Sequence, residues 1–250
     1  MGQADWAALG GALDPADLAL GVVEAAVITP PNGGGDYVFG FNSLDGTVTG
    51  AAGLYVDLAG FAPTGPGTTP TGGTSIRGAV RRVSSPNNTG FSPFLFCCAQ
   101  GGPPTVNDDA YMLGLSDADP YKIMLVKGPM IGGVNPDSGE HVILGQSSAQ
   151  YSMGDDLWHH MRLDAIVEPN GSVLLKVFSN DLALHPLDVP SGHDWQNVPG
   201  FAAAGIVDDN LRIITGSAPL WGGYCGFGFA VAEALNRRGA FDELEALVVT

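Results

Sequence analysis

Turn-forming residues divide this chain of 250 residues into short apolar runs. It contains 37 Gly and 18 Pro, many of them lying between those runs. Because Gly and Pro weaken helix interiors and are favoured in tight turns, the pattern predicts many strands joined by turns. Sandwiches often reach this length as one domain, so we expect a single all-β domain over residues 21–250, preceded by an N-terminal arm over residues 1–20.

The arm carries Trp6 and several leucines, and Asp14 followed by Pro15 has the form of a helix N-cap and first helical position. We therefore expect a short helical or irregular segment. Two placements stay open: packing against its own domain, or docking on a neighbouring subunit.

Two hairpins are the clearest local predictions. Residues 157–167 and 173–178 are apolar strands of similar length around the turn EPNGS (168–172), in which Asn170 and Gly171 are expected to take positive φ angles. Residues 111–115 and 121–127 flank the turn-forming set SDADP (116–120) in the same way.

Alternation along other strands predicts which side chains share a face. In residues 75–83, Ile76 and Val80 should lie on one face and Arg77 and Arg81 on the other. In GFGF (226–229), the two phenylalanines should share a face, leaving bare backbone on the opposite face for another layer to approach. The Pro-, Gly- and Thr-rich stretch 62–74 is expected to be an exposed loop.

The three cysteines, Cys97, Cys98 and Cys225, are odd in number and lack C-x-x-C spacing, so they favour neither a disulfide framework nor a zinc site. We expect buried thiols. Alternation should point one of the adjacent pair Cys97 and Cys98 inward and the other outward.

Charge and hydropathy narrow the function classes. Ten Lys and Arg against 26 Asp and Glu give a net charge of -16, which repels nucleic acid and anionic membrane surfaces. The opening residues lack the basic and apolar regions of a signal peptide, and no apolar run reaches eighteen residues. We expect a soluble chain that neither binds nucleic acid nor inserts into membranes.

The order of several motifs in the second half of the chain resembles that of a known fold. The order LWHHMRLD (157–164), Pro-Asn-Gly hairpin, GFGF (226–229) and terminal FDELE (241–245) resembles the concanavalin A-like lectin and glucanase jelly roll. The resemblance implies a two-sheet antiparallel sandwich. Glucanases of that type present Glu-x-Asp-x-x-Glu on one strand, and this pattern is absent from the sequence. Glu243 and Glu245 share a strand face without the remaining acids, so we expect no enzymatic activity.

Segments along most of the chain resemble tailed-phage virion proteins; they are YVFGFNS (37–43), SIRGA (75–79), YMLGLSD (111–117), NDL (180–182) and GSAPL (216–220). This resemblance implies a capsid decoration, tail or baseplate component, assembled in the host cytoplasm as a homo-oligomer that contacts other virion proteins. The alternatives are a lectin-like module that recognises a glycan or receptor and, more weakly, a glycoside hydrolase.

Five residues are candidates for ligand binding. His160, Arg162 and Asp164 fall on one face of a strand, whereas His159 and His160 lie on opposite faces and do not bind one ion together. Trp195 and Trp221 lie in predicted loops and are candidates for stacking on a sugar ring. The alternatives are an ordinary hydrogen-bonded surface row and tryptophans that anchor their own loops.

We predict no resident cofactor, with calcium as the one ion to consider. Asp117, Asp119, Asp208 and Asp209 offer loop carboxylates of the kind that Ca²⁺ prefers, although the EF-hand spacing is missing. Aspartates also start turns without any metal, and that interpretation stays open.

Overall fold

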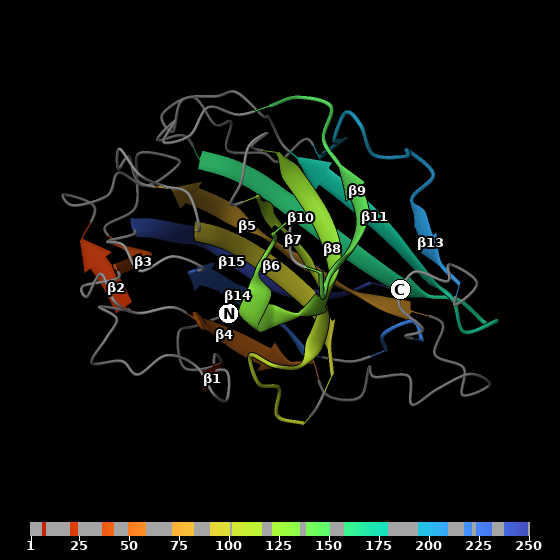
Figure 1. Cartoon of the computed structure of the whole chain (residues 1–250), viewed down its shortest axis with the longest axis horizontal. Coiled ribbons are helices and arrows are strands. Elements are labelled where there is room, and N and C mark those ends of the chain that lie inside the picture. The colour runs from red at the N-terminus through yellow and green to blue at the C-terminus, as the bar shows by residue number, and fades with distance from the viewer. Residues whose placement is uncertain are drawn as a thin grey trace.

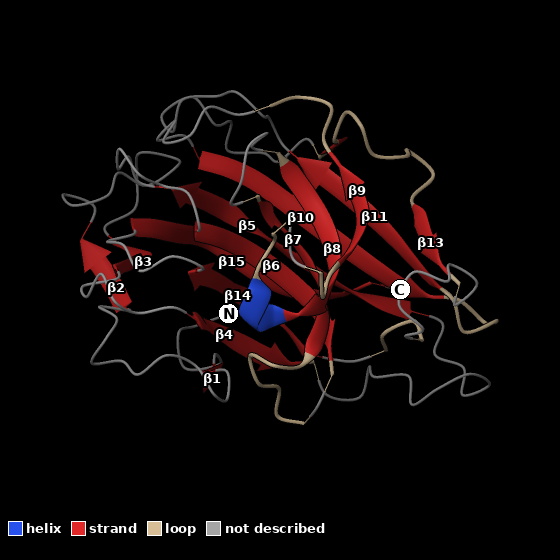
Figure 2. Ribbon diagram, viewed as in Figure 1, coloured by secondary structure: helices blue, strands red, loops and turns tan. Residues whose placement is uncertain are grey.

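Strands make up almost all of the regular secondary structure in the described part of the chain, in this computed structural model (Figures 1 and 2). Its single 3-10 helix in this part of the chain is η2 (Met130–Gly132), and within these residues no helix is long and apolar enough to cross a membrane. The structure describes residues 7–8, 21–24, 37–42, 50–58, 72–82, 91–100, 102–116, 122–135, 139–150, 158–179, 195–209, 218–221, 224–231 and 238–249.

The strands form two antiparallel sheets, one over the other, and β8 crosses in front of β10 in Figure 1. The seven-stranded sheet has the order β1 (Ala7–Ala8), β4 (Gly50–Asp57), β14 (Tyr224–Val231), β6 (Phe91–Ala99), β7 (Asp109–Leu115), β8 (Ile123–Pro129) and β9 (Val142–Gln146). The eight-stranded sheet has the order β12 (Gln196–Asn197), β11 (Val173–Ser179), β10 (Trp158–Val167), β5 (Gly72–Arg82), β15 (Arg238–Val249), β3 (Tyr37–Asn42) and β2 (Gly21–Glu24), with β13 (Ile206–Asp208) also paired to β11.

Of the predicted N-terminal arm, only residues 7–8 are described, and they pair with β4 of the same chain. The division of the chain at residue 20 stays a prediction.

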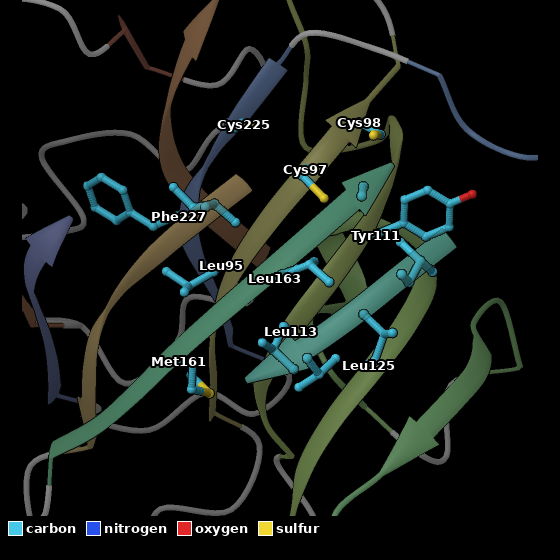
Figure 3. Close-up of a cluster of buried hydrophobic side chains, with 14 of the residues drawn as sticks. Leu95, Cys97, Cys98, Tyr111, Leu113, Leu125, Met161, Leu163, Cys225 and Phe227 are labelled. Carbon is cyan, nitrogen blue, oxygen red and sulfur yellow. The ribbon is translucent and has the colours of Figure 1, made fainter. Parts of the chain in front are cut away.

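The main core fills the space between the sheets. Met161 and Leu163 of β10 point inward with Ile76 of β5, and they pack with Leu95 and Leu113 of the other sheet (Figure 3). Each of these side chains is fully buried, and burying one contributes about 1.5–3 kcal/mol. The predicted two-sheet antiparallel sandwich is confirmed, as is the alternation of Ile76 and Val80 against Arg77 in β5.

The outward faces of the two sheets differ. A second apolar cluster covers the seven-stranded sheet, where Phe96, Met112 and Met124 pack with Met130 of η2 and Val134. On the eight-stranded sheet, β5 and β10 instead turn arginine and aspartate side chains outward. Of the two outward faces, the one on the eight-stranded sheet therefore carries these charged side chains.

Both predicted hairpins are present, since β7 pairs with β8 and β10 pairs with β11. In the second turn, only Gly171 has a positive φ, at 85°, and Asn170 was wrongly expected to share it. Gly171 N–H donates to the Glu168 carbonyl and Glu168 N–H donates to the Ser172 carbonyl. This is the longer turn that needs one left-handed residue, whereas a two-residue type I′ turn needs two.

The cysteine prediction is half right. Cys97, Cys98 and Cys225 are buried thiols, but Cys97 and Cys98 both belong to the main core. The register between β6 and β14 shifts here, so that Cys225 faces two residues of β6, and Cys98 takes a φ of 55°. This β-bulge interrupts the alternation that the sequence prediction assumed.

The loop predicted over residues 62–74 ends earlier than expected, and residues 59–71 lie outside the described part of the chain. Gly72, Gly73 and Thr74 are buried members of β5. Gly73 pairs with Ile166 of β10, and a Cβ added at Gly73 would lie 2.2 Å from the Ala165 carbonyl oxygen. The close approach of β5 and β10 therefore requires glycine at position 73. In the sequence, this glycine had the same appearance as the glycines of a turn.

The expected separation of glycines and phenylalanines along β14 is confirmed, because Phe227 and Phe229 enter the main core. The bare backbone of Gly226 is covered by the ring of Phe96 from the neighbouring strand β6. A Cβ at Gly226 would lie 2.1 Å from the Leu54 carbonyl oxygen, which is backbone and has little room to move.

Gly226→Ala should therefore destabilise the fold by about 3 kcal/mol, the upper part of the usual range for overpacking. Gly139→Ala is the matched control, because nothing lies within 4 Å of its added Cβ. Urea unfolding of both variants measures the difference, and equal midpoints would contradict the packing described for β14.

Candidate functional site

The candidate site is the outward face of four adjacent strands of the eight-stranded sheet, which we call the arginine face. It consists of Arg77 of β5, Arg162 and Asp164 of β10, Phe178 of β11 and Glu245 of β15. Each side chain alternates with core residues of its own strand. The strand register places Phe178, Arg162, Arg77 and Glu245 in one row across the sheet.

Asp164 is the most enclosed acid of this face. Its two carboxylate oxygens accept hydrogen bonds from Nε and Nη2 of Arg162, each at 2.7 Å. Only 5% of the Asp164 side chain is exposed, compared with 27% of Arg162. The guanidinium carbon of Arg162 also lies 5.2 Å from the centre of the Phe178 ring. This arrangement gives Asp164 a paired charge and holds Arg162 against an aromatic face.

Glu245 is bound in a similar way but is more exposed. Nε of Arg77 donates to Glu245 Oε2 at 2.7 Å, and Nη2 of Arg77 donates to the same oxygen. The two side chains are 29% and 36% exposed. Because Arg77 and Arg162 are directly opposite each other, their like charges would repel without these two carboxylates.

Asp164 and Glu245 do not have the arrangement of the two acids of a glycoside hydrolase. By strand register, Asp164 and Glu245 are two strands and two residues apart, roughly 12 Å between Cα atoms at standard strand spacings. Both carboxylates are engaged by arginines, whereas hydrolases need one acid as proton donor and a second as base or nucleophile. Glu243, the other acid of the terminal strand, has no described side chain.

The predicted ligand residues are only partly brought together. His160 shares the outward face with Arg162 and Asp164 but is buried opposite Ala79, and His159 is turned toward the core. Trp221 packs against the main core, and its indole N–H donates to the Gly171 carbonyl at 3.0 Å. Trp195 is half-buried just before β12. Trp221 is thus an anchor between its loop and the β10–β11 turn; the ligand-binding roles stay predictions.

The calcium candidates do not form a cluster in the described part of the chain. Asp117 and Asp119 lie outside it, Asp209 is exposed, and no group of three metal-binding side chains occurs among the described residues. Asp208 is buried, and its Oδ2 already accepts hydrogen bonds from Lys127 and Tyr111. Lys127 already balances the charge of Asp208, and the calcium-binding role of the four aspartates stays a prediction.

The Lys127 cluster was missed in the sequence and lies between the sheets. Lys127 Nζ is 2.7 Å from Asp208 Oδ2 and donates to the Ala218 carbonyl at 2.8 Å. The Tyr111 hydroxyl donates to the same Asp208 oxygen at 2.7 Å and accepts from Leu220 N–H at 2.9 Å. The available signal was Lys127 itself, a charged residue two positions after the inward Leu125.

Burial keeps the hydroxyl of Tyr111 and the thiols of Cys97 and Cys225 protonated. Burial, followed by the charge of Asp208, raises the pKa of Tyr111 far above its usual value, so its hydroxyl stays protonated. Burial likewise raises the pKa of Cys97 well above normal and that of Cys225 to about 12. These two thiols are therefore poor nucleophiles at neutral pH.

Comparison with known proteins shows the fold. The cellulose-induced protein Cip1 aligns over 99% of this chain and 93% of its own, with a TM-score of 0.53 and 9% identity. The legume lectin-like domain from Entamoeba histolytica aligns over 96% of both chains, at 10% identity and a TM-score of 0.43. A Bacteroides ovatus mixed-linkage glucan GH16 protein covers 99% of this chain and 96% of its own, at 10% identity and a TM-score of 0.46. No protein-family profile and no curated protein sequence matches.

The sandwich is thus a concanavalin A-like jelly roll, as the sequence resemblance implied. Identities this low carry the fold and no activity.

The unequal burial of the two ion pairs leads to a prediction for the arginine face. Arg162→Met should destabilise the fold by about 2–3 kcal/mol, because it leaves the buried Asp164 carboxylate without its partner. Arg77→Met makes the same chemical change on the next strand but should cost less than about 1 kcal/mol, because Glu245 is accessible to water. Chemical unfolding of the two variants tests this order; a larger loss for Arg77→Met would contradict it.

Proposed function

We propose that this chain is a non-enzymatic structural component of a tailed-phage particle, and that its sandwich acts by binding other proteins of the particle. The observation that carries the non-enzymatic part is the pairing of both described carboxylates of the arginine face with arginines. A carboxylate that is paired with a guanidinium is poorly placed to exchange a proton with a substrate. The virion assignment is supported by the sequence resemblance of segments along most of the chain.

Exposed apolar groups on edge strands support assembly. Ile143 is 44% exposed on β9, the last strand of the seven-stranded sheet, and Val207 is 39% exposed on β13. Edge strands offer unpaired backbone groups, and apolar side chains beside them favour contact with another chain. We propose that the edge strands β9 and β13 join copies of the chain in a homo-oligomer. The net charge of -16 keeps the free subunits apart from nucleic acid during assembly in the host cytoplasm.

The assembly proposal predicts a defined oligomer in light scattering, with the same mass in the presence and absence of calcium. Ile143→Lys should reduce the mass to that of a monomer by placing a charge at the edge. Ile131→Lys is the control, since Ile131 is 40% exposed but lies on η2. Antibodies raised against the purified chain should label intact particles at a fixed position in electron microscopy. A monomer at all concentrations, together with unlabelled particles, would refute the proposal.

A second candidate function is glycan recognition by the arginine face. The observation in its favour is the half-buried Phe178 ring beside Arg162 and Lys176, since aromatic faces next to charged donors are typical of sugar sites. This candidate implies no chemical reaction, in agreement with the paired carboxylates.

On a glycan array, this second function predicts a defined set of retained sugars. Phe178→Ala should then weaken binding at least tenfold, or about 1.4 kcal/mol. Leu174→Ala is the matched control, because Leu174 is also half-buried and shares the outward face of β11 four residues away. No retained sugar, or equal binding by both variants, would exclude recognition through this face.

A further inference from the structure

The Lys127 cluster places an amine against a carboxylate inside the sandwich. Lys127 and Tyr111 are directly opposite each other on β8 and β7, and Asp208 ends β13 on the other sheet. The exposed fractions of the Lys127 and Asp208 side chains are 5% and 7%. The cluster lies where the Tyr111 hydroxyl leaves the apolar core, directed away from the labelled leucines in Figure 3.

From this juxtaposition we propose that Lys127 and Asp208 condense to form an intramolecular isopeptide bond that links the two sheets covalently. Lys127 Nζ is 2.7 Å from Asp208 Oδ2, so the carboxyl carbon, one bond further, is at most about 4 Å from the nitrogen. The tertiary structure thus keeps the amine beside the carboxyl carbon, and this proximity replaces the encounter of two separate reactants.

The buried environment favours the neutral product over the ion pair. Two buried charges carry a desolvation cost that their mutual attraction only partly offsets. Condensation replaces the ammonium and the carboxylate by one uncharged amide. In water, hydrolysis opposes this reaction, but the buried site restricts the access of the water molecule that the reverse step needs.

The reaction balances without any further reagent. A proton passes from the Lys127 ammonium to Asp208 Oδ2, and the neutral amine attacks Cγ of Asp208. The C–N bond forms and the bond from Cγ to Oδ2 breaks. Oδ2 leaves as water, carrying two of the three ammonium protons, and no atom is oxidised or reduced. The remaining N–H of the new amide keeps the Ala218 carbonyl as its acceptor, which Lys127 Nζ already contacts at 2.8 Å.

Tyr111 is positioned to assist the departure of Oδ2. Its oxygen accepts from Leu220 N–H, which directs its own proton to Asp208 Oδ2 at 2.7 Å. Because burial raises the pKa of Tyr111, the hydroxyl remains a donor throughout the neutral and mildly alkaline range. The oxygen that must leave is therefore the one that receives hydrogen bonds from both Lys127 and Tyr111.

The product would close a covalent loop across the sandwich. Lys127 and Asp208 are 81 positions apart, and they join β8 of the seven-stranded sheet to β13, which pairs with β11 of the other sheet. A crosslink over such a distance restricts the unfolded chain strongly and resists separation of the sheets.

Intact-mass spectrometry of the purified full chain tests the proposal. The wild type should be lighter by one water molecule than the uncondensed chain, and trypsin should yield one branched peptide that joins segments 123–162 and 177–212, with no cleavage after Lys127. Lys127→Arg keeps the positive charge beside Asp208 but should show the full sequence mass. Tyr111→Phe should condense about 100-fold more slowly, the usual contribution of a positioned proton donor, so both masses should be present together.

Two outcomes would overturn the proposal. One is a wild-type chain that keeps its full mass, with cleavage after Lys127, after prolonged incubation of the folded protein; Lys127 and Asp208 would then remain an ion pair. The other is an equal loss of water in Lys127→Arg, which would place the modification elsewhere. Urea unfolding of Lys127→Arg verifies that this variant is folded when its mass is measured.

Discussion

The register between β5 and β10 determines how most of the described structure is arranged. Ten consecutive residue pairs join these central strands, from Trp158 with Arg81 to Val167 with Gly72. In this register Ile76 and Leu163 meet in the core while Arg77 and Arg162 meet outside it. A shift of β10 by one residue would exchange its two faces and place His160, Arg162 and Asp164 between the sheets. The fold and the arginine face therefore depend on the same set of strand pairs.

The outward faces of the two sheets differ, and this difference places the glycan-recognition hypothesis on the eight-stranded sheet. Apolar residues and η2 cover the seven-stranded sheet, so that its inner and outer faces are both largely buried. The eight-stranded sheet carries ion pairs whose acids differ in exposure. Because both acids are bound by arginines, we favour binding and assembly over catalysis as the proposed function.

Predictions made from the local sequence failed where the result depended on how a strand pairs with its neighbour. The sequence prediction separated Cys97 from Cys98, but the bulge opposite Cys225 turns both into the core. It placed residues 72–74 in a loop because glycine and threonine are common in turns, whereas Gly73 is needed where β5 approaches the backbone of β10. Both errors arise because composition does not specify which strand lies beside a residue. The prediction that Phe227 and Phe229 share a face succeeded because β14 pairs regularly with β4 and, from Gly226 onward, with β6.

By itself, the sequence determined the all-β class, the two hairpins, the inward face of β5 and the shared face of His160, Arg162 and Asp164, since these follow from turn chemistry and from the two-residue period of strands. Only the tertiary structure decided that Glu245 pairs with Arg77, that Phe178 lies beneath Arg162, and that Asp208 meets Lys127 and Tyr111. These partners are 16 to 168 positions apart, so their contacts depend on strand order and register. Long-range pairing brings such groups together, and no local pattern encodes it.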